Sequence, residues 1–196
     1  MNVEDHRRLL RKKRRALSST EQDKAAQGIL DNVCQHRVLE QAGRVAIYLA
    51  NDGEINPMRI YSYFHGQSIN WFLPRLPLDG SRIMEFAELK NNTEMLPNRF
   101  GILEPSANGS SGNPASSMDV IFMPLVGFDR NGNRLGRGGG YYDSTLSLIP
   151  SNCSSNPLLV GLGHHFQENE QFHPQGWDVQ LQTIITDQEF ICVKQK

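Results

Sequence analysis

Arg134-Leu-Gly-Arg-Gly-Gly-Gly-Tyr-Tyr-Asp143 is the most informative segment of this 196-residue sequence. It follows an apolar run at residues 120–126 and a polar turn at residues 129–133. The apolar run predicts a buried strand, and the spacing of apolar residues after Gly140 predicts a helix. Because predicted strands and helices alternate elsewhere too, we expect an α/β fold with a mostly parallel central sheet flanked by helices.

The glycine-rich segment predicts a phosphate-binding loop. Its four glycines are Gly136, Gly138, Gly139 and Gly140. Glycine lets the backbone adopt positive φ and approach a ligand closely, and Arg134 and Arg137 favour an anionic ligand. The start of a helix attracts the same charge, because its N–H groups are unpaired. The spacing matches neither the dinucleotide-binding fingerprint nor the Walker loop, and a wide turn without a ligand is the alternative interpretation.

The longer segment 128–143 resembles the signature of the 5-formyltetrahydrofolate cyclo-ligases, also called 5,10-methenyltetrahydrofolate synthetases. The resemblance extends from the basic N-terminal segment to the last predicted strand. It implies one Rossmann-like domain over residues 1–196, which agrees with the length of the chain. It also implies an enzyme that converts ATP and 5-formyltetrahydrofolate into 5,10-methenyltetrahydrofolate, ADP and phosphate with the help of Mg²⁺.

The resemblance assigns roles to individual residues of this segment. ATP is expected to contact Arg134, Leu135, Gly136, Arg137, Gly138, Gly139, Gly140, Tyr141 and Tyr142. The reduced folate is expected to contact residues 137–141 of the same set. Arg137 and Tyr141 are the expected catalytic residues. Asp143 and Asp178 are the expected Mg²⁺ ligands, and Mg²⁺ commonly takes one or two carboxylates together with nucleotide phosphates.

The N-terminal segment 5–17 carries seven basic side chains and contains neither glycine nor proline, so we predict a helix. Arg7, Arg11 and Arg14 share one stripe of this helix, beside the apolar Leu10. The stripe therefore predicts an anion contact. A solvated basic helix and a contact to nucleic-acid phosphates are the alternatives.

This helix also resembles the Lys-x-x-Leu-Arg element that binds ATP phosphates in cyclo-ligases. The resemblance assigns Arg7, Arg8 and Arg11 to ATP, with Arg7 at the position where lysine is usual. The replacement keeps the charge but changes the reach and the hydrogen-bonding geometry of the side chain.

Two further segments carry expected folate contacts. Residues 44–50 predict a short strand, followed by a turn that contains Asp52 and Glu54. Such carboxylates are either plain turn residues or ligands at the end of a strand. The resemblance favours a ligand, because Leu49 and Glu54 match the folate-contacting leucine and glutamate of cyclo-ligases. A carboxylate can accept two hydrogen bonds from adjacent donors on a pterin.

Phe100 precedes a sequence that resembles the Gly-Ile-x-Glu-Pro element of the same family, and we expect it to stack on the folate. The polar segment 106–117 predicts a mobile surface loop. Residues 158–163 predict a strand that leads to His164 and His165. Adjacent residues of an extended chain point to opposite sides, so we do not expect these histidines to share a metal.

Composition excludes several classes of protein. A net charge of −1 argues against a protein that mainly coats nucleic acid, and no apolar stretch approaches the roughly 20 residues that span a membrane. Cys34, Cys153 and Cys192 lack metal-ligand spacing and predict reduced thiols. We expect a cytoplasmic monomer whose partner is a small reduced folate, with neither nucleic acid nor membrane as partner. A small kinase and a nucleic-acid-binding module are the alternative functions.

Overall fold

The computed structural model describes residues 2–108, 111–150, 156–169 and 178–194, so Cys153 lies outside the described residues. The helices of this part of the chain are α1 (Val3–Arg15), α2 (Ser19–Gln35), α3 (Met58–Phe64) and α4 (Tyr141–Leu146), with short 3₁₀ turns η1 (Ala115–Ser117) and η2 (His165–Gln167). The strands are β1 (Arg44–Ala46), β2 (Asn70–Arg75), β3 (Glu85–Glu88), β4 (Met95–Pro97), β5 (Leu103–Pro105), β6 (Gly112–Asn113), β7 (Val120–Pro124), β8 (Gly127–Phe128), β9 (Arg134–Leu135), β10 (Leu158–Gly163), β11 (Thr183–Thr186) and β12 (Phe190–Cys192).

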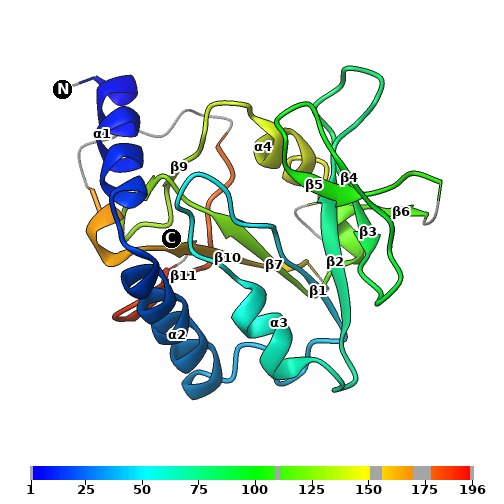
Figure 1. Cartoon of the computed structure of the whole chain (residues 1–196), viewed down its shortest axis with the longest axis horizontal. Helices are drawn as coiled ribbons and strands as arrows, with labels where there is room; N and C mark the ends of the chain where they lie inside the picture. Colours follow the sequence, from blue (N-terminus) through cyan, green and yellow to red (C-terminus); the bar gives the residue numbers. More distant parts are fainter. Residues whose placement is uncertain (1, 109–110, 151–155, 170–177, 195–196) are drawn as a thin grey trace.

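Eight strands form the central sheet in the order β12-β11-β10-β7-β1-β2-β3-β6. The five middle strands, from β11 to β2, run parallel to one another. β12, β3 and β6 add to the two sides as antiparallel strands. The predicted fold class, a mostly parallel sheet flanked by helices, is therefore confirmed (Figure 1).

Two hydrophobic clusters cover the two faces of the sheet, because successive side chains of a strand point to opposite faces. In β1, Val45 belongs to the cluster that includes Ile29 of α2 and Ile60 of α3. The neighbouring residue, Ala46, belongs to the other cluster, together with Leu146 of α4. α2 and α3 thus cover one face, and α4 with its adjoining loops covers the opposite one.

Helix α1 docks through Leu10, which is buried against Val126 and Leu135 beside the glycine-rich segment. The predicted apolar contact of this helix is therefore present, and it directs the basic stripe towards the carboxyl ends of the parallel strands. Of the helices that the structure describes, none has the length and the apolar composition needed to cross a membrane.

Three details differ from the expectations. The strand predicted at 44–50 is paired only over β1, and the helix after Gly140 ends at Leu146. The described residues of the predicted mobile loop at 106–117 include a strand and a buried side chain: β6 pairs with β3, and Ala115 is buried. The polar composition of this segment does not suggest a strand. One of its polar residues, Asn113, nevertheless binds the sheet, because its side-chain amide donates a hydrogen bond to the Phe86 carbonyl oxygen at 3.1 Å.

Candidate active site

A cleft of about 570 Å³ opens at the carboxyl ends of β1, β2 and β7. This is the end at which open α/β sheets usually bind ligands. Every residue to which the resemblance assigned a role lines this cleft except Arg8: Arg7, Arg11, Leu49, Glu54, Phe100, Arg134, Leu135, Gly136, Arg137, Gly138, Gly139, Gly140, Tyr141, Tyr142, Asp143 and Asp178. Arg14, the third arginine of the predicted anion-binding stripe, is buried and does not line it. These residues come from α1, the loop after β1, the β4–β5 hairpin, the glycine-rich segment and the chain before β11.

The glycine-rich segment forms an open loop between β9 and α4. Gly138 and Gly140 have φ of +94° and +71°, in the left-handed region that favours glycine. At Gly139, a Cβ atom would lie 2.9 Å from the Tyr141 ring, so the tyrosine packs directly over the loop backbone. α4 has only six residues, so its dipole adds less to anion binding than the sequence suggested, and the loop amides and arginines carry more of that role.

Of the three α1 arginines that were assigned to ATP, two face the cleft. Arg7 donates from Nε to the Gly136 carbonyl oxygen at 2.9 Å, which joins the helix to the glycine-rich loop. Arg11 donates to Asp52 at 2.7 Å. Arg8 points outward, with a side chain that is 79% exposed and paired with Asp5. Positions 7 and 11 lie one turn apart on the same face of a helix, whereas position 8 lies on a neighbouring face.

Glu54 is buried at the base of the cleft. Burial raises the pKa of its carboxyl group, while Arg14 and the Asn51 N–H counteract this rise. Arg14 lies 3.4 Å from Glu54 Oε1, and Arg137 approaches the same oxygen to 3.9 Å from the glycine-rich loop. The carboxylate therefore lies between two arginines, one behind it in the core and one across the cleft.

Arg134 and Asp143 form an ion pair at the other end of the glycine-rich segment. Asp143 also accepts a hydrogen bond from the Val179 N–H at 3.2 Å, and Arg134 donates to the Val179 carbonyl oxygen. The neighbouring Asp178 lines the cleft. The structure thus brings both predicted metal ligands to one cleft, and it uses Asp143 to hold the chain that carries Asp178.

The β4–β5 hairpin contributes an aromatic wall with a cation that the sequence did not reveal. Phe100 is 55% exposed and lies edge to face with Tyr141, with ring centres 6.1 Å apart. The Arg99 guanidinium lies 5.3 Å from the Tyr141 ring centre and 5.6 Å from that of Phe100, and it donates a hydrogen bond to the tyrosine hydroxyl. Only its position next to Phe100 could have suggested this role.

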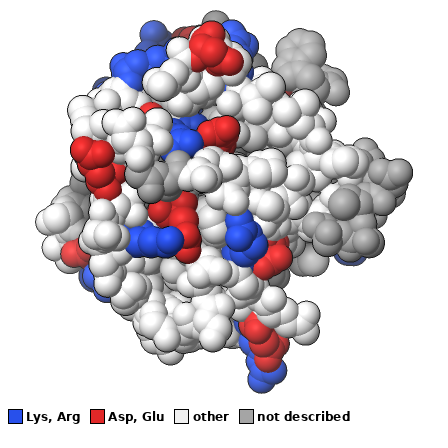
Figure 2. Space-filling model, turned by 90° about the vertical axis from the view of Figure 1, so that its right-hand side faces the viewer, with Lys and Arg blue, Asp and Glu red and all other residues white. Residues whose placement is uncertain are grey.

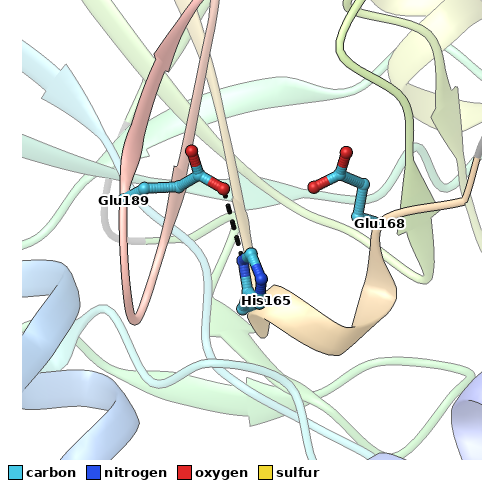
Figure 3. A group of neighbouring side chains, drawn as sticks. All are labelled: His165, Glu168 and Glu189. Atoms are coloured by element: carbon cyan, nitrogen blue, oxygen red, sulfur yellow. Dashed lines mark ion pairs between the residues drawn. The ribbon is translucent and has the colours of Figure 1, made fainter.

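The adjacent histidines have separate environments. His164 is buried beside Phe166, with Nε2 3.2 Å from the Gly53 carbonyl oxygen, and burial lowers its pKa. His165 belongs to a second group with Glu168 and Glu189, whose two carboxylates point towards each other (Figure 3).

Arg130 is paired with both glutamates of the His165 group, at 2.6 Å from each. Its guanidinium supplies the positive charge that two neighbouring carboxylates require, so this group forms an ion-pair cluster at the surface. The geometry of the group does not point to a metal centre.

The face that carries the β3–β6 end of the sheet has mixed charge. Basic and acidic side chains are interspersed there among uncharged ones (Figure 2). Nucleic-acid-binding surfaces usually gather basic residues on one face, so this face does not favour the alternative of a nucleic-acid-binding module.

Comparisons with known proteins identify the family of this chain. The family model of the 5-formyltetrahydrofolate cyclo-ligase family matches residues 2–187. The chain is 34% identical over 177 residues to the 5-formyltetrahydrofolate cyclo-ligase of Haemophilus influenzae, covering 90% of this chain and 92% of that protein. It is 31% identical over 179 residues to that of Escherichia coli K12, covering 91% and 96%.

Solved structures show the same fold. The 5,10-methenyltetrahydrofolate synthetase of Aquifex aeolicus superposes with a TM-score of 0.83 at 23% identity, covering 100% of this chain and 95% of the other. The synthetase of Mycoplasma pneumoniae gives a TM-score of 0.75 at 24% identity, covering 95% and 99%. The fold, the family model and the relatives agree, and the chain belongs to the 5-formyltetrahydrofolate cyclo-ligase family and is an enzyme.

Proposed function

We propose that this protein converts 5-formyltetrahydrofolate into 5,10-methenyltetrahydrofolate in a reaction that consumes ATP, requires Mg²⁺ and releases ADP and phosphate. One observation carries the proposal. A single cleft collects an arginine-bearing glycine loop, a buried carboxylate, an exposed aromatic ring and two aspartates from five separate parts of the chain. A phosphate donor and a flat heterocycle with polar edges need this combination of groups.

The formyl oxygen is a poor leaving group, so the reaction needs an activated oxygen. Transfer of the terminal phosphoryl group of ATP to that oxygen forms a new O–P bond and releases ADP. N10 then attacks the formyl carbon and loses its proton, and the C–O bond breaks as phosphate leaves. Phosphoryl transfer requires mainly positioning and neutralisation of charge from the protein.

The phosphates are assigned to the loop from Gly136 to Gly140, which includes Arg137. Arg7 and Arg11 of α1 face this loop. Arg7 already donates to the loop backbone, so the guanidinium lies next to the amides that would bind a phosphate. Arg137 lies near Glu54, at the boundary between the two substrates. We therefore assign Arg137 to the charge that develops on the transferred phosphoryl group.

The folate is assigned to Glu54, Leu49, Phe100 and Tyr141. Glu54 can accept from the adjacent donors of the pterin, and Leu49 gives that ring an apolar contact. Phe100 and Tyr141 form an edge-to-face pair at the rim of the cleft, where a flat ring can pack against them. An ionised Glu54 is required for this role, and the two arginines beside it favour that state.

Asp143 and Asp178 fit a hard cation, because both line the phosphate end of the cleft and offer oxygen ligands. When bound, Mg²⁺ would neutralise charge on the nucleotide phosphates. Arg134 pairs with Asp143 and keeps this carboxylate oriented. We expect Asp178→Asn to raise the Mg²⁺ concentration needed for half-maximal activity, with little change in the KM for folate; an unchanged Mg²⁺ requirement would remove Asp178 from this role.

The reaction itself provides the main test. The product absorbs in the near ultraviolet, where the formyl substrate does not. We expect purified protein, 5-formyltetrahydrofolate and MgATP to produce a rise in this absorbance, and omission of ATP to abolish it. A folded protein that binds ATP without producing the rise would contradict the proposal and favour the small-kinase alternative.

A further inference from the structure

Arg14 of α1 is completely buried, and each of the three nitrogens of its guanidinium donates a hydrogen bond. Nε donates to the Asp52 carbonyl oxygen at 2.7 Å, and Nη1 donates to the Leu125 carbonyl oxygen at 3.0 Å. Nη2 reaches two carboxylates, Asp52 at 2.8 Å and Glu54 at 3.4 Å. One buried cation thus joins α1, the end of β7 and the loop after β1.

The loop that Arg14 holds has an unusual backbone. Asp52 has φ of +59°, which is uncommon for a residue with a side chain, and Gly53 has φ of +74°. A Cβ atom at Gly53 would lie 2.6 Å from the Arg14 carbonyl oxygen, so the loop is pressed against the end of α1. Gln22 also donates to the carbonyl oxygens of Arg14 and Gly53, both at 3.1 Å.

Only one of the two carboxylates that Arg14 contacts lines the substrate cleft. Asp52 accepts from Arg11 as well, and these hydrogen bonds bring its pKa below its usual value despite desolvation. Glu54 lines the cleft, where the proposed function places the pterin. Burying a cation is costly unless it is paired, and Asp52 already pairs with Arg14. The additional contact with Glu54 is therefore not needed to anchor α1.

We propose that Arg14 is a positioning residue, which fixes the Glu54 carboxylate in the cleft and couples its orientation to the docking of α1. This inference rests on the proposed role of Glu54 in folate binding. Arg14 does not line the cleft, so it acts through Glu54, which does.

The charged and titratable groups around Glu54 define the test. They are Arg14 from α1, Asp52 from the same loop, Tyr48 after β1, Arg137 from the glycine-rich loop and Tyr142 from α4. The two tyrosines stay neutral near pH 7 because desolvation raises the pKa of each phenol. Arg14 is therefore the buried cation whose removal most alters the charge balance at Glu54.

The first readout needs no ligand. The Glu54 side-chain carboxyl signal is followed by carbon NMR across pH, and its assignment comes from the spectrum of Glu54→Gln. We expect Arg14→Gln to move the Glu54 titration to higher pH, because the variant can still bond backbone carbonyls but carries no charge. The matched control is Gln22→Ala, which removes a neutral contact between α1 and the same loop and should leave the titration unchanged.

The second readout compares the two substrates. Arg14→Gln should weaken 5-formyltetrahydrofolate binding about tenfold, and this loss should become smaller as the pH rises through the Glu54 titration of the variant. Binding of a non-hydrolysable ATP analogue should change less than about twofold. Equal losses for both substrates, or an unchanged Glu54 titration in a folded variant, would show that Arg14 only anchors the helix and would overturn the proposal.

Arg14→Lys covers the case in which Arg14→Gln does not fold. Lysine keeps the charge but cannot contact two carbonyl oxygens and two carboxylates together. We expect folate binding to fall several-fold with ATP-analogue binding retained, and wild-type folate binding in this variant would overturn the proposal. If the wild-type protein does not bind 5-formyltetrahydrofolate, the proposed function fails, whereas the Glu54 titration still decides whether Arg14 controls this carboxylate.

Discussion

The two halves of the signature segment differ in where their polar groups point. In the first half, residues 128–133, the Asp129 carboxylate is buried and accepts from the N–H groups of Asn131 and Asn133 and from the Asn133 side chain, at 2.7–3.0 Å. In the second half, residues 134–143, the glycine loop lies along the cleft, and Arg137 extends towards Glu54. The Asp129 turn of the first half is thus satisfied by its own neighbours, whereas the glycine loop of the second half faces the cleft.

This difference teaches that a long motif can combine a structural part with a chemical part. The turn holds β8 against β9, where Gly127 lies opposite Leu135 and Phe128 lies opposite Arg134. The hairpin sets where the glycine loop begins. Substitutions in the first half should therefore reduce stability, and substitutions in the second half should reduce turnover of a folded protein.

Arg137→Ala should have the largest effect. We expect kcat/KM to fall about 1,000-fold, because an arginine that stabilises a transferred phosphoryl group contributes on this scale. The melting temperature should stay close to that of the wild type, since the side chain is partly exposed and its carboxylate neighbour lies 3.9 Å away. Arg137→Lys is the control for charge and should lose less. Near-normal turnover of Arg137→Ala would remove this residue from the active site.

Asp129→Ala should have the largest effect on stability. It leaves two backbone N–H groups and one side-chain amide without their acceptor, which costs about 3 to 4 kcal/mol of unfolding free energy. Denaturant unfolding measures this loss, and Asp129→Asn should fall between the two proteins because it keeps one acceptor oxygen. A loss of activity in Asp129→Ala without any loss of stability would break the division between the two halves.

Two glycines offer a matched comparison within the motif. Gly132 in the turn and Gly138 in the loop both have positive φ, at +83° and +94°. A Cβ atom at Gly132 would lie 2.5 Å from the Leu181 carbonyl oxygen, whereas at Gly138 the nearest atom is Arg7 Cζ at 3.8 Å. Alanine should therefore cost roughly 2 to 3 kcal/mol at position 132 and about 1 kcal/mol at position 138.

Activity should show the opposite order for these two variants. Gly138→Ala places a methyl group beside the Arg7 guanidinium in the cleft, so it should lower turnover more than its small stability cost suggests. Gly132→Ala should keep near-normal turnover at temperatures where it is folded. Equal effects on stability would mean that the turn can move away from Leu181, and the comparison between the halves would lose its steric basis.

Much of the fold could be predicted because it depends on local patterns. The strands β7 and β10 follow from their continuous apolar runs, and the central parallel sheet follows from strands separated by helices. The sequence analysis did not predict the β4–β5 hairpin, because its two strands are short and only partly buried. Its strands are defined by their contact with each other and with β2.

The site shows the same limit more sharply. The resemblance identified many of the residues that line the cleft, since these lie in recognisable local motifs. It could not reveal that Arg14 turns inward while Arg7 and Arg11 face the cleft, because Arg14 meets Asp52, 38 positions away, only in the folded chain. The acceptor role of Asp129 was hidden for the opposite reason: its partners are so close that the segment resembles an ordinary polar turn.

Arg99→Ala should have the smallest effect of these variants. It tests whether the substrate site formed by residues 134–143 also includes the β4–β5 hairpin. The guanidinium contacts the Tyr141 ring and hydroxyl from the β4–β5 hairpin, so it holds the tyrosine at the rim of the cleft. Exposed cation–π contacts of this kind are weak, and we expect the KM for 5-formyltetrahydrofolate to rise about two- to fivefold, with kcat and stability nearly unchanged. Lys90→Ala removes one exposed positive charge elsewhere and should leave KM unaltered. If both variants raise KM equally, long-range charge explains the effect. If only Arg99→Ala does so, the hairpin contributes to folate binding through the contact between Arg99 and Tyr141.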